Sequence, residues 1–346
     1  MLVARFYAPG DIRLEQAPEP TAGPGQLKIA VANCSTCGTD VKISRHGHHH
    51  IRPPRVIGHE IAGRIVEVGE GVTGWDEGDR VQVIAAIPCG TCVECADGRF
   101  TVCSNQESMG YHYDGGFAEY MIIPESVLAV DGVNRVPENI DLAEASVAEP
   151  LACVLNGQEI AGVGEGDTVV VMGAGPIGCL HVRLARAKGA AKVFLVDINR
   201  GRLDMSADIV RPDATICGGE VDAVQEVLDL TGGRGADVVI TAAASGRAQE
   251  DALKMVSRSG RISFFGGLPK DAPIIQLDSN LVHYREISIF GANGSSPEHN
   301  RRALELIASG AVPVADLITE RMPLSDVHKA IETVASGTAI KVTIEP

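Results

Sequence analysis

Residues 168–197 have the sequence TVVVMGAGPIGCLHVRLARAKGAAKVFLVD. The first and last parts are apolar runs, and the stretch between them, from Pro176 onward, has the composition of a helix. Three more apolar runs, ADVVITAAA, RISFFGG and EISIFGA, follow after intervening helical stretches. Continuous apolar strands that alternate with helices are typical of a parallel sheet covered on both faces. Residues 165–290 therefore predict an α/β domain with a doubly wound parallel sheet.

A glycine-rich turn joins the first of these strands to its helix. The turn is Gly173-Ala174-Gly175-Pro176-Ile177-Gly178. The first glycine permits the tight turn, the second lets the backbone approach a pyrophosphate, and the third lets helix pack on strand. The first N–H groups of the helix then hold the phosphates. The strand before the turn and the helix after it make this pattern a predicted dinucleotide site, with Gly173, Gly175, Pro176, Ile177 and Gly178 as its residues.

Asp197 ends the second strand, about 20 residues further on, where a ribose-binding carboxylate is expected. It can accept hydrogen bonds from both hydroxyls of an adenine ribose, and it would repel a 2′-phosphate. Asp197 therefore favours NAD over NADP. Arg202 weakens this preference because a guanidinium near the ribose could accommodate a phosphate. It could equally stack on the adenine or lie solvated at the start of a helix.

The first 150 residues have a different pattern. Short runs such as QLKIAVAN, IAGRIVEVG, DRVQVIAA and FAEYMIIP alternate apolar and polar residues and are separated by Gly and Pro. This pattern predicts a body of short β-strands. The last segment, about 296–346, contains a helical stretch and a final strand, AIKVTIEP, and we expect it to fold back onto this β-rich domain.

Four cysteines lie close together in the run PCGTCVECADGRFTVC: Cys89, Cys92, Cys95 and Cys103. Their spacing allows a tight loop to present four thiolates in the tetrahedral geometry of a structural zinc site. A bacterial iron–sulfur motif would have three residues before its last cysteine and a proline after it, whereas here seven residues intervene and Ser104 follows. Disulfides fit a secreted protein better. We predict a structural zinc ion.

Bulk composition indicates an intracellular enzyme. The chain has 346 residues, long enough for two domains, and a formal net charge of −15. It contains no long basic run, so its charge argues against nucleic-acid and anionic-membrane partners. The N-terminus lacks the pattern of a signal peptide, and no apolar run is long enough to span a membrane. Nine cysteines without a secretion signal predict thiols and metal ligands in the cytoplasm.

Four further residues could form a reactive metal site. Oxidation of an alcohol is easier when a Zn²⁺ ion lowers the pKa of its hydroxyl, and such an ion needs three protein ligands and an open position. Cys37 lies in NCSTCGTD, His59 and Glu60 lie in PRVIGHEIAG, and Glu149 lies in SVAEPLAC. Each taken alone has a simpler explanation as a buried thiol, a core histidine or a surface acid, and for a lone His or Glu that explanation is the better one.

Taken together, the motifs GHEIAG, DGGFAEY, AEPLAC, GAGPIG and VDINRGR and the four-cysteine lobe resemble the zinc-dependent medium-chain alcohol dehydrogenase family, in its sorbitol and threonine dehydrogenase branch. The resemblance extends over essentially the whole chain. It implies a GroES-like zinc domain over 1–150 and 292–346, with its structural zinc lobe at 88–104. It also implies a Rossmann NAD-binding domain over 151–291.

The resemblance also assigns roles to single residues. It implies that Cys37, His59 and Glu149 bind a catalytic zinc ion, and that Glu60 lies beside it as a direct or transient ligand or as a partner of the zinc-bound water. Thr39 matches the family hydroxyl that takes the substrate proton.

One relay position departs from the family pattern. Where many members have a histidine that passes the proton to solvent, this chain has Lys42, which could complete the relay, contact a phosphate or lie solvated. Four nearby histidines could substitute or form a rim loop: His46, His48, His49 and His50.

The substrate region departs as well. Sorbitol dehydrogenases have an Arg–Tyr pair after the strand that ends the second domain, and this chain has Gly294 and Ser295 there. We therefore expect a hydroxyl-rich small molecule, such as a polyol, cyclitol or aminocyclitol, without committing to sorbitol. An L-threonine-like amino alcohol is the alternative, and a non-catalytic, crystallin-like nucleotide-binding protein is an alternative of another class. The resemblance implies a homodimer or homotetramer formed through the edge strand near 285–292.

Overall fold

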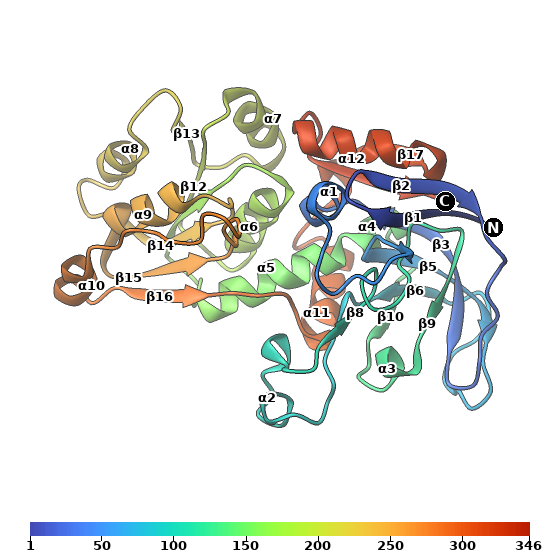
Figure 1. Cartoon of the computed structure of the whole chain (residues 1–346). Helices are drawn as coiled ribbons and strands as arrows, with labels where there is room; N and C mark the ends of the chain where they lie inside the picture. Colours follow the sequence, from blue (N-terminus) through green and yellow to red (C-terminus); the bar gives the residue numbers. More distant parts are fainter. The chain divides into compact units, whose positions relative to one another are not determined.

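The computed structural model describes residues 1–346 as two compact units (Figure 1). The β-rich unit comprises Met1–Ala152 and Gly294–Pro346, and the parallel-sheet unit comprises Cys153–Asn293. The helix α5 (Ala148–Ile160) begins in the first and continues into the second.

The parallel-sheet unit contains a six-stranded sheet with the order β13-β12-β11-β14-β15-β16, and every neighbouring pair is parallel. Its strands are β11 (Thr168–Met172), β12 (Lys192–Asp197), β13 (Ala214–Cys217), β14 (Ala236–Thr241), β15 (Val256–Phe264) and β16 (Ser288–Gly291). Its helices are α6 (Pro176–Ala187), α7 (Arg200–Val210), α8 (Ala223–Leu230), α9 (Gly246–Met255) and α10 (Ser279–Arg285). This is the predicted doubly wound parallel sheet, in the Rossmann strand order.

The sequence of the sheet explains its burial. Val169, Val170 and Val171 of β11 are fully buried, and β12 and β14 are buried over most of their length. Strands that are covered on both faces need apolar side chains at every position. The order changes direction between β11 and β14, so a crevice for a ligand is expected at the carboxyl end of β11, where the glycine-rich turn begins.

The β-rich unit is built around a sheet with the order β10-β6-β5-β3-β18-β17, to which β9 is added on β3. Its strands are β3 (Leu27–Ser35), β5 (Glu60–Val68), β6 (Arg80–Val83), β9 (Tyr120–Ile123), β10 (Val133–Arg135), β17 (Ile318–Pro323) and β18 (Lys341–Glu345). A three-stranded sheet contains β2 (Asp11–Gln16), β1 (Leu2–Ala8) and β4 (Arg55–Val56), and β7 (Ala86–Ile87) pairs with β8 (Glu107–Ser108).

Short helices connect these strands. They are α1 (Gly38–His46), α2 (Val93–Ala96), α3 (Glu125–Leu128), α4 (Leu142–Ser146), α11 (Pro297–Ala308) and α12 (Val327–Ser336). Three 3₁₀ turns lie at η1 (Phe100–Val102), η2 (Ala315–Leu317) and η3 (Leu324–Asp326). The helices of the chain are all too short or too polar to cross a lipid bilayer.

The C-terminal segment completes the main sheet of the β-rich unit. β18 pairs antiparallel with β3, where Ile344 lies opposite Cys34, and parallel with β17. Residues 310 positions apart in the chain therefore become neighbours, and the last strand lies between β3 and β17 in the sheet.

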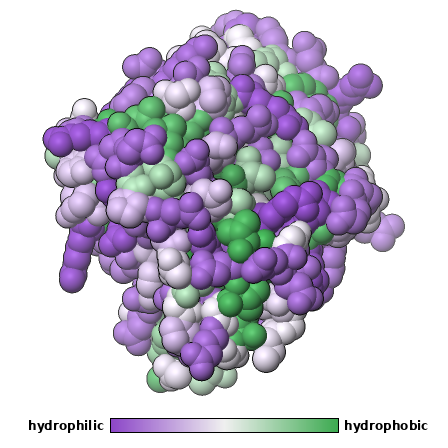
Figure 2. Space-filling view, turned by 90° about the vertical axis from the view of Figure 1, so that its right-hand side faces the viewer, coloured by the Kyte–Doolittle hydropathy of each residue, from purple (hydrophilic) through white to green (hydrophobic).

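Figure 2 shows one face of the molecule, on which hydrophobic residues lie in small separate groups among mostly hydrophilic ones.

Candidate metal centres and cofactor site

Cys37, His59 and Glu60 come together at the end of two neighbouring strands. Cys37 follows β3 as the N-cap of α1, whereas Glu60 opens β5 directly after His59. β3 and β5 are antiparallel, and their register places Ser35 opposite Glu60. One ligand atom from each of the three side chains lies within 4.8 Å of the others. A thiolate, an imidazole and a carboxylate at this separation fit a Zn²⁺ ion.

Gly58 fixes the backbone before His59. Its φ is +91°, and a Cβ atom there would lie 2.6 Å from the Phe117 ring and 2.8 Å from the Cys34 sulfur. Only glycine fits both the conformation and the space. The close packing under Gly58 therefore determines the direction in which the His59 side chain leaves the main chain.

Burial alone would raise the pKa of the Cys37 thiol. The hydrogen bond to His59 and the positive charges of His59 and Lys341 outweigh burial, and the pKa of Cys37 is lowered. Burial would also lower the pKa of His59, but Cys37 and the carboxylates of Asp40 and Glu149 raise it well above its usual value. The site therefore favours a thiolate at Cys37, which is the form that binds metals.

Asp40 supports both of these ligands from α1. Its carboxylate accepts a hydrogen bond of 2.8 Å from the Cys37 backbone N–H, and its other oxygen lies 3.7 Å from His59 Nδ1. Asp40 Oδ1 and His59 Nδ1 are both buried without a hydrogen-bond partner. Since Nδ1 faces Asp40, Nε2 is the ring nitrogen left for a metal ion.

Lys341 of β18 forms a buried ion pair with Glu60. The two side chains are only 3% and 1% exposed, and Lys341 Nζ donates a 2.9 Å hydrogen bond to the Thr36 carbonyl. Burial raises the pKa of Glu60 well above its usual value, and the charge of Lys341 opposes that shift. Glu60 thus has two possible partners, this ammonium group and a metal ion.

Glu149 lies in the first turn of α5 and is buried. It is outside the close set of three ligand atoms, but its charge acts on His59, Glu60 and Lys341. The structure thus brings all four predicted ligands into one region, with Glu149 the furthest from the other three.

Thr39 is half-buried in the first turn of α1, two residues after Cys37. It lies beside the hydroxyl of Tyr111, whose ring centroid lies 5.9 Å from that of His59. Burial is the main cause that raises the pKa of Tyr111, so its hydroxyl stays protonated.

The other residues singled out in the sequence lie outside the close set of ligand atoms. Lys42 is exposed on α1, and His46 is exposed at the end of the same helix. Ser295, at the substrate position that departs from the family pattern, is buried and accepts a 3.1 Å hydrogen bond from Asn300. Gly294 has a φ of +56° and open space around it.

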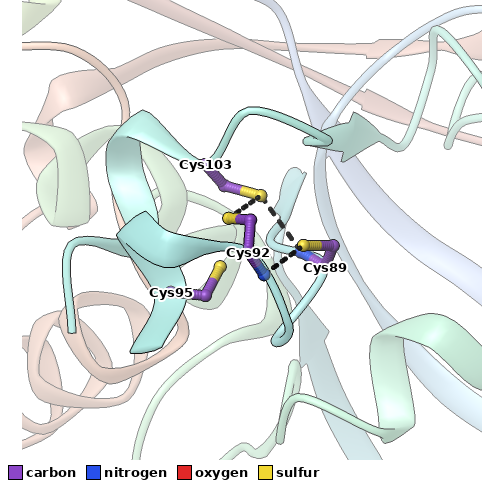
Figure 3. A group of neighbouring side chains, drawn as sticks. All are labelled: Cys89, Cys92, Cys95 and Cys103. Carbon is purple, nitrogen blue, oxygen red and sulfur yellow. Dashed lines mark hydrogen bonds between the residues drawn. The ribbon is translucent and has the colours of Figure 1, made fainter. Parts of the chain in front are cut away.

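The four cysteines of the lobe point toward one another (Figure 3). Their sulfur atoms all lie within 4.8 Å of one another, and the sulfurs of Cys92 and Cys103 are 3.7 Å apart. A tetrahedron with zinc–sulfur bonds of about 2.3 Å has edges of roughly 3.8 Å. The four side chains therefore fit a single zinc ion.

Backbone donors surround the lobe sulfurs. The N–H of Cys89 donates to Cys103 Sγ at 3.2 Å, and the N–H of Cys92 donates to Cys89 Sγ at 3.3 Å. Hydrogen bonds from Thr91 lower the pKa of Cys89 to about 5, whereas burial raises the pKa of Cys95 to about 12. All four thiols must lose their protons to bind a metal ion, and the cation then compensates the negative charge of the four thiolates.

The glycine-rich turn in the parallel-sheet unit has the shape that a phosphate site needs. A Cβ on Gly178 would lie 1.8 Å from the Gly173 carbonyl oxygen, so the helix packs directly on the turn. A Cβ on Gly175 would meet only Arg202 Nη1, at 4.0 Å. This open space beside a guanidinium and the start of α6 (Pro176–Ala187) fits a pyrophosphate.

Asp197 lies at the end of β12, beside this turn. Its two oxygens accept hydrogen bonds from the backbone N–H groups of Ala174, at 2.7 Å, and Asn199, at 2.8 Å. A carboxylate accepts about four hydrogen bonds, so two positions remain for ribose hydroxyls.

Sequence analysis did not identify Asp40, Lys341 or Tyr111. Asp40 stands three residues after Cys37, as in a capping box, and Lys341 is a charged residue in a strand whose residues are buried up to Glu345. Both patterns were visible signals. Tyr111 belongs to the loop before DGGFAEY and carries no local signal of its position.

Comparison with known proteins adds family matches in both units. Residues 23–132 match the model of the alcohol dehydrogenase GroES-like domain, and residues 176–309 match that of the zinc-binding dehydrogenase.

Similar proteins cover nearly the whole chain. A sorbitol dehydrogenase of Halalkalibacterium halodurans is 33% identical over 100% of this chain and 98% of its own. An L-threonine 3-dehydrogenase of Pyrococcus furiosus is 34% identical over 95% of this chain and 93% of its own. A solved structure described as a zinc-binding dehydrogenase from Sinorhizobium meliloti 1021, bound to NADP, has a TM-score of 0.93 and 30% identity, covering 100% of this chain and 99% of its own.

Proposed function

Because this chain belongs to the zinc-binding alcohol dehydrogenase family, an oxidoreductase family, we propose that it transfers hydride between NAD(H) and the secondary alcohol of a polyol, cyclitol or aminocyclitol. The observation that carries this proposal is the convergence of Cys37, His59 and Glu60 from separate segments of the chain. A non-catalytic nucleotide-binding protein would have no need of this set.

We assign the catalytic zinc ion to Cys37, His59 and Glu149, with Glu60 beside them, and the structural zinc ion to the lobe cysteines Cys89, Cys92, Cys95 and Cys103. A bound zinc ion would act as a Lewis acid that lowers the pKa of the alcohol hydroxyl, and a bound nicotinamide ring would accept the hydride. The protein residues position the alcohol and move its proton.

Thr39 is the proposed acceptor of the hydroxyl proton. Its side chain lies beside the hydroxyl of Tyr111, which stays protonated because burial raises its pKa. Lys42 is exposed on α1, so any proton that it carries exchanges directly with water. It can therefore serve only as the solvent end of a relay.

Replacement of Cys37 by serine tests the metal assignment. Serine is a poor zinc ligand, so C37S is expected to bind about one zinc ion per chain instead of two and to lose turnover. NADH binding, measured by fluorescence, is expected to persist because the cofactor turn lies in the other unit. Turnover at the wild-type rate in C37S would refute the assignment.

We propose NAD as the cofactor, on the basis of Asp197. Its carboxylate would repel the 2′-phosphate of NADP, although Arg202 lies near the turn and a structural relative was solved with NADP. D197A is expected to reduce the ratio of kcat/KM for NAD over that for NADP by at least tenfold. An unchanged ratio would show that Asp197 does not select the cofactor.

L-Threonine is the second candidate substrate, since a relative that covers most of the chain is named an L-threonine 3-dehydrogenase. The sorbitol dehydrogenase relative favours polyols at similar identity. Initial rates of NADH formation with polyols, inositols and L-threonine at equal concentrations distinguish the two classes.

We further propose a cytoplasmic homodimer or homotetramer. Nine cysteines that include two sets of metal ligands suit a reducing compartment. β16 is the edge strand of the parallel sheet. Tyr284, on the helix that precedes β16, is 72% exposed, and Ile274, in the segment before that helix, is 88% exposed. An unpaired strand edge and exposed apolar side chains in the preceding segment support association of two copies.

A further inference from the structure

A pocket in the β-rich unit is lined mainly by basic side chains. It has a volume of about 390 Å³ and is formed by the segment that leads into β4, by the start of β8 and by the loop after β8. Two arginines and three histidines line it: Arg52, Arg55, His49, His50 and His112. The chain as a whole carries a net charge of −15, so this concentration of basic groups is a local exception.

The two arginines have unused hydrogen-bonding capacity. Arg52 is exposed and forms no ion pair. Arg55 donates to Asp114 at 3.1 Å, but its Nε is buried without an acceptor. A guanidinium presents five donors, and its fork matches the oxygens of a phosphate or a carboxylate.

The histidines add further donors. His112 Nδ1 accepts a 3.0 Å hydrogen bond from the Ser108 backbone N–H, so a neutral His112 carries its proton on Nε2. The ring centroids of His50 and His112 are 5.0 Å apart. Burial, followed by the charges of His50, Arg55 and Arg52, lowers the pKa of His112. An anion among these groups would relieve their mutual repulsion.

One carboxylate, Glu107, also lines the pocket. Its Oε2 accepts a 2.6 Å hydrogen bond from the Tyr113 hydroxyl, and its charge opposes the lowered pKa of His112. With all histidines neutral, Glu107 and the Asp114 carboxylate that pairs with Arg55 balance the charges of the two arginines. Each protonated histidine then gives the pocket a positive charge.

The pocket adjoins the candidate metal centre. Tyr111 lines the pocket, its ring centroid lies 5.9 Å from that of His59, and its hydroxyl lies beside Thr39. A single side chain therefore separates the basic groups from the proposed proton acceptor and a proposed metal ligand. A small molecule that contacts both would have to extend past the Tyr111 side chain, with a hydroxyl at one end and an anionic group at the other.

We propose that this pocket binds the anionic group, a phosphate ester or a carboxylate, of the substrate whose hydroxyl is oxidised beside Cys37 and His59. This inference rests on the proposed dehydrogenase function and narrows its substrate class to hydroxyl compounds that carry a negative charge.

Binding of inorganic phosphate and of acetate to the zinc-loaded protein tests the pocket without turnover. Isothermal titration at constant ionic strength is expected to give one saturable site. R52Q is expected to weaken binding about tenfold, the effect of losing one charged hydrogen bond. R45Q is the matched control, because Arg45 is exposed on α1 and does not line the pocket. Equal binding by R52Q and R45Q, or no saturable site, would overturn the proposal.

Turnover then identifies the source of the anion. Sorbitol 6-phosphate represents the phosphate ester, L-threonine the carboxylate, and sorbitol the uncharged control. An anionic substrate is expected to exceed sorbitol in kcat/KM, and R52Q is expected to reduce that ratio about tenfold. Sorbitol oxidation with no preference for either anion would refute the pocket and retain the dehydrogenase. Saturable phosphate binding that R52Q weakens, with no alcohol oxidised, would retain the pocket and refute the dehydrogenase.

Discussion

Lys341 and Glu60 form an ion pair that is almost completely removed from water. A charge in such a place is stable only when it is paired and hydrogen-bonded, and Lys341 meets both conditions through Glu60 and the Thr36 carbonyl. The pair also holds the Glu60 carboxylate at the edge of the metal centre. Lys341 is therefore a positioning residue for Glu60.

Replacement of Lys341 by methionine is expected to destabilise the fold by about 3–5 kcal/mol, because Glu60 is left buried without its partner. The measurement is the free energy of unfolding in urea, with zinc content determined in parallel. K341M/E60Q, which removes both charges, is expected to recover most of the loss, and K341R serves as the control that keeps the charge. A K341M variant within 1 kcal/mol of the wild type would contradict the structural importance of the pair.

At the scale of elements, α5 and α6 meet through a buried polar contact in the parallel-sheet unit. His181 of α6 is fully buried, and the Gln158 side chain of α5 donates a 2.8 Å hydrogen bond to its carbonyl. The Phe265 ring packs edge-on against the imidazole, and the two ring centroids are 4.7 Å apart. Burial lowers the pKa of His181 to about 3, so the folded protein holds this ring neutral.

His181 makes the stability of this unit sensitive to acid. The unfolded chain protonates the ring below pH 6.5 and the folded chain does not, so stability is complete above pH 6.5 and falls as the pH drops toward 3. Between pH 7.5 and 5.0 the loss from this group is expected to be about 2 kcal/mol. Urea unfolding at the two pH values should show a smaller difference for H181Q than for the wild type. Equal differences would rule out His181 as a source of the pH dependence.

At the scale of the whole molecule, the parallel sheet has an edge strand that no other strand of the chain covers. The parallel sheet ends at β16, a short strand with exposed and half-buried residues, and α10 (Ser279–Arg285) beside it has no buried residue. Tyr284 on α10 and Ile274 before it are exposed. In an isolated molecule these apolar side chains stay in contact with water, whereas a second copy could cover them.

Tyr284 tests the proposed oligomer. Y284K puts a charge into the apolar surface next to β16 and is expected to shift the protein toward smaller species in light scattering coupled to size-exclusion chromatography. V221K is a suitable control, because Val221 is 43% exposed and lies away from α10 in the sequence. The proposed interface would be excluded if Y284K and V221K had the same mass as the wild type.

Local patterns were enough to predict the sites whose residues are close in sequence. The turn from Gly173 to Gly178 and the lobe from Cys89 to Cys103 each lie within one short segment, so spacing alone restricts their geometry. The parallel sheet was predictable for a related reason, since burial on both faces requires continuous apolar strands. For Cys37, His59 and Glu149, the residues suggested chemistry, but only the resemblance to a family joined them.

The tertiary structure alone decided which distant groups face these residues. Lys341 reaches Glu60 because β18 pairs with β3, and Arg52 lies near His112 because two loops close one pocket. Strand register and loop packing depend on burial summed over the whole unit, and no short stretch of sequence contains that information.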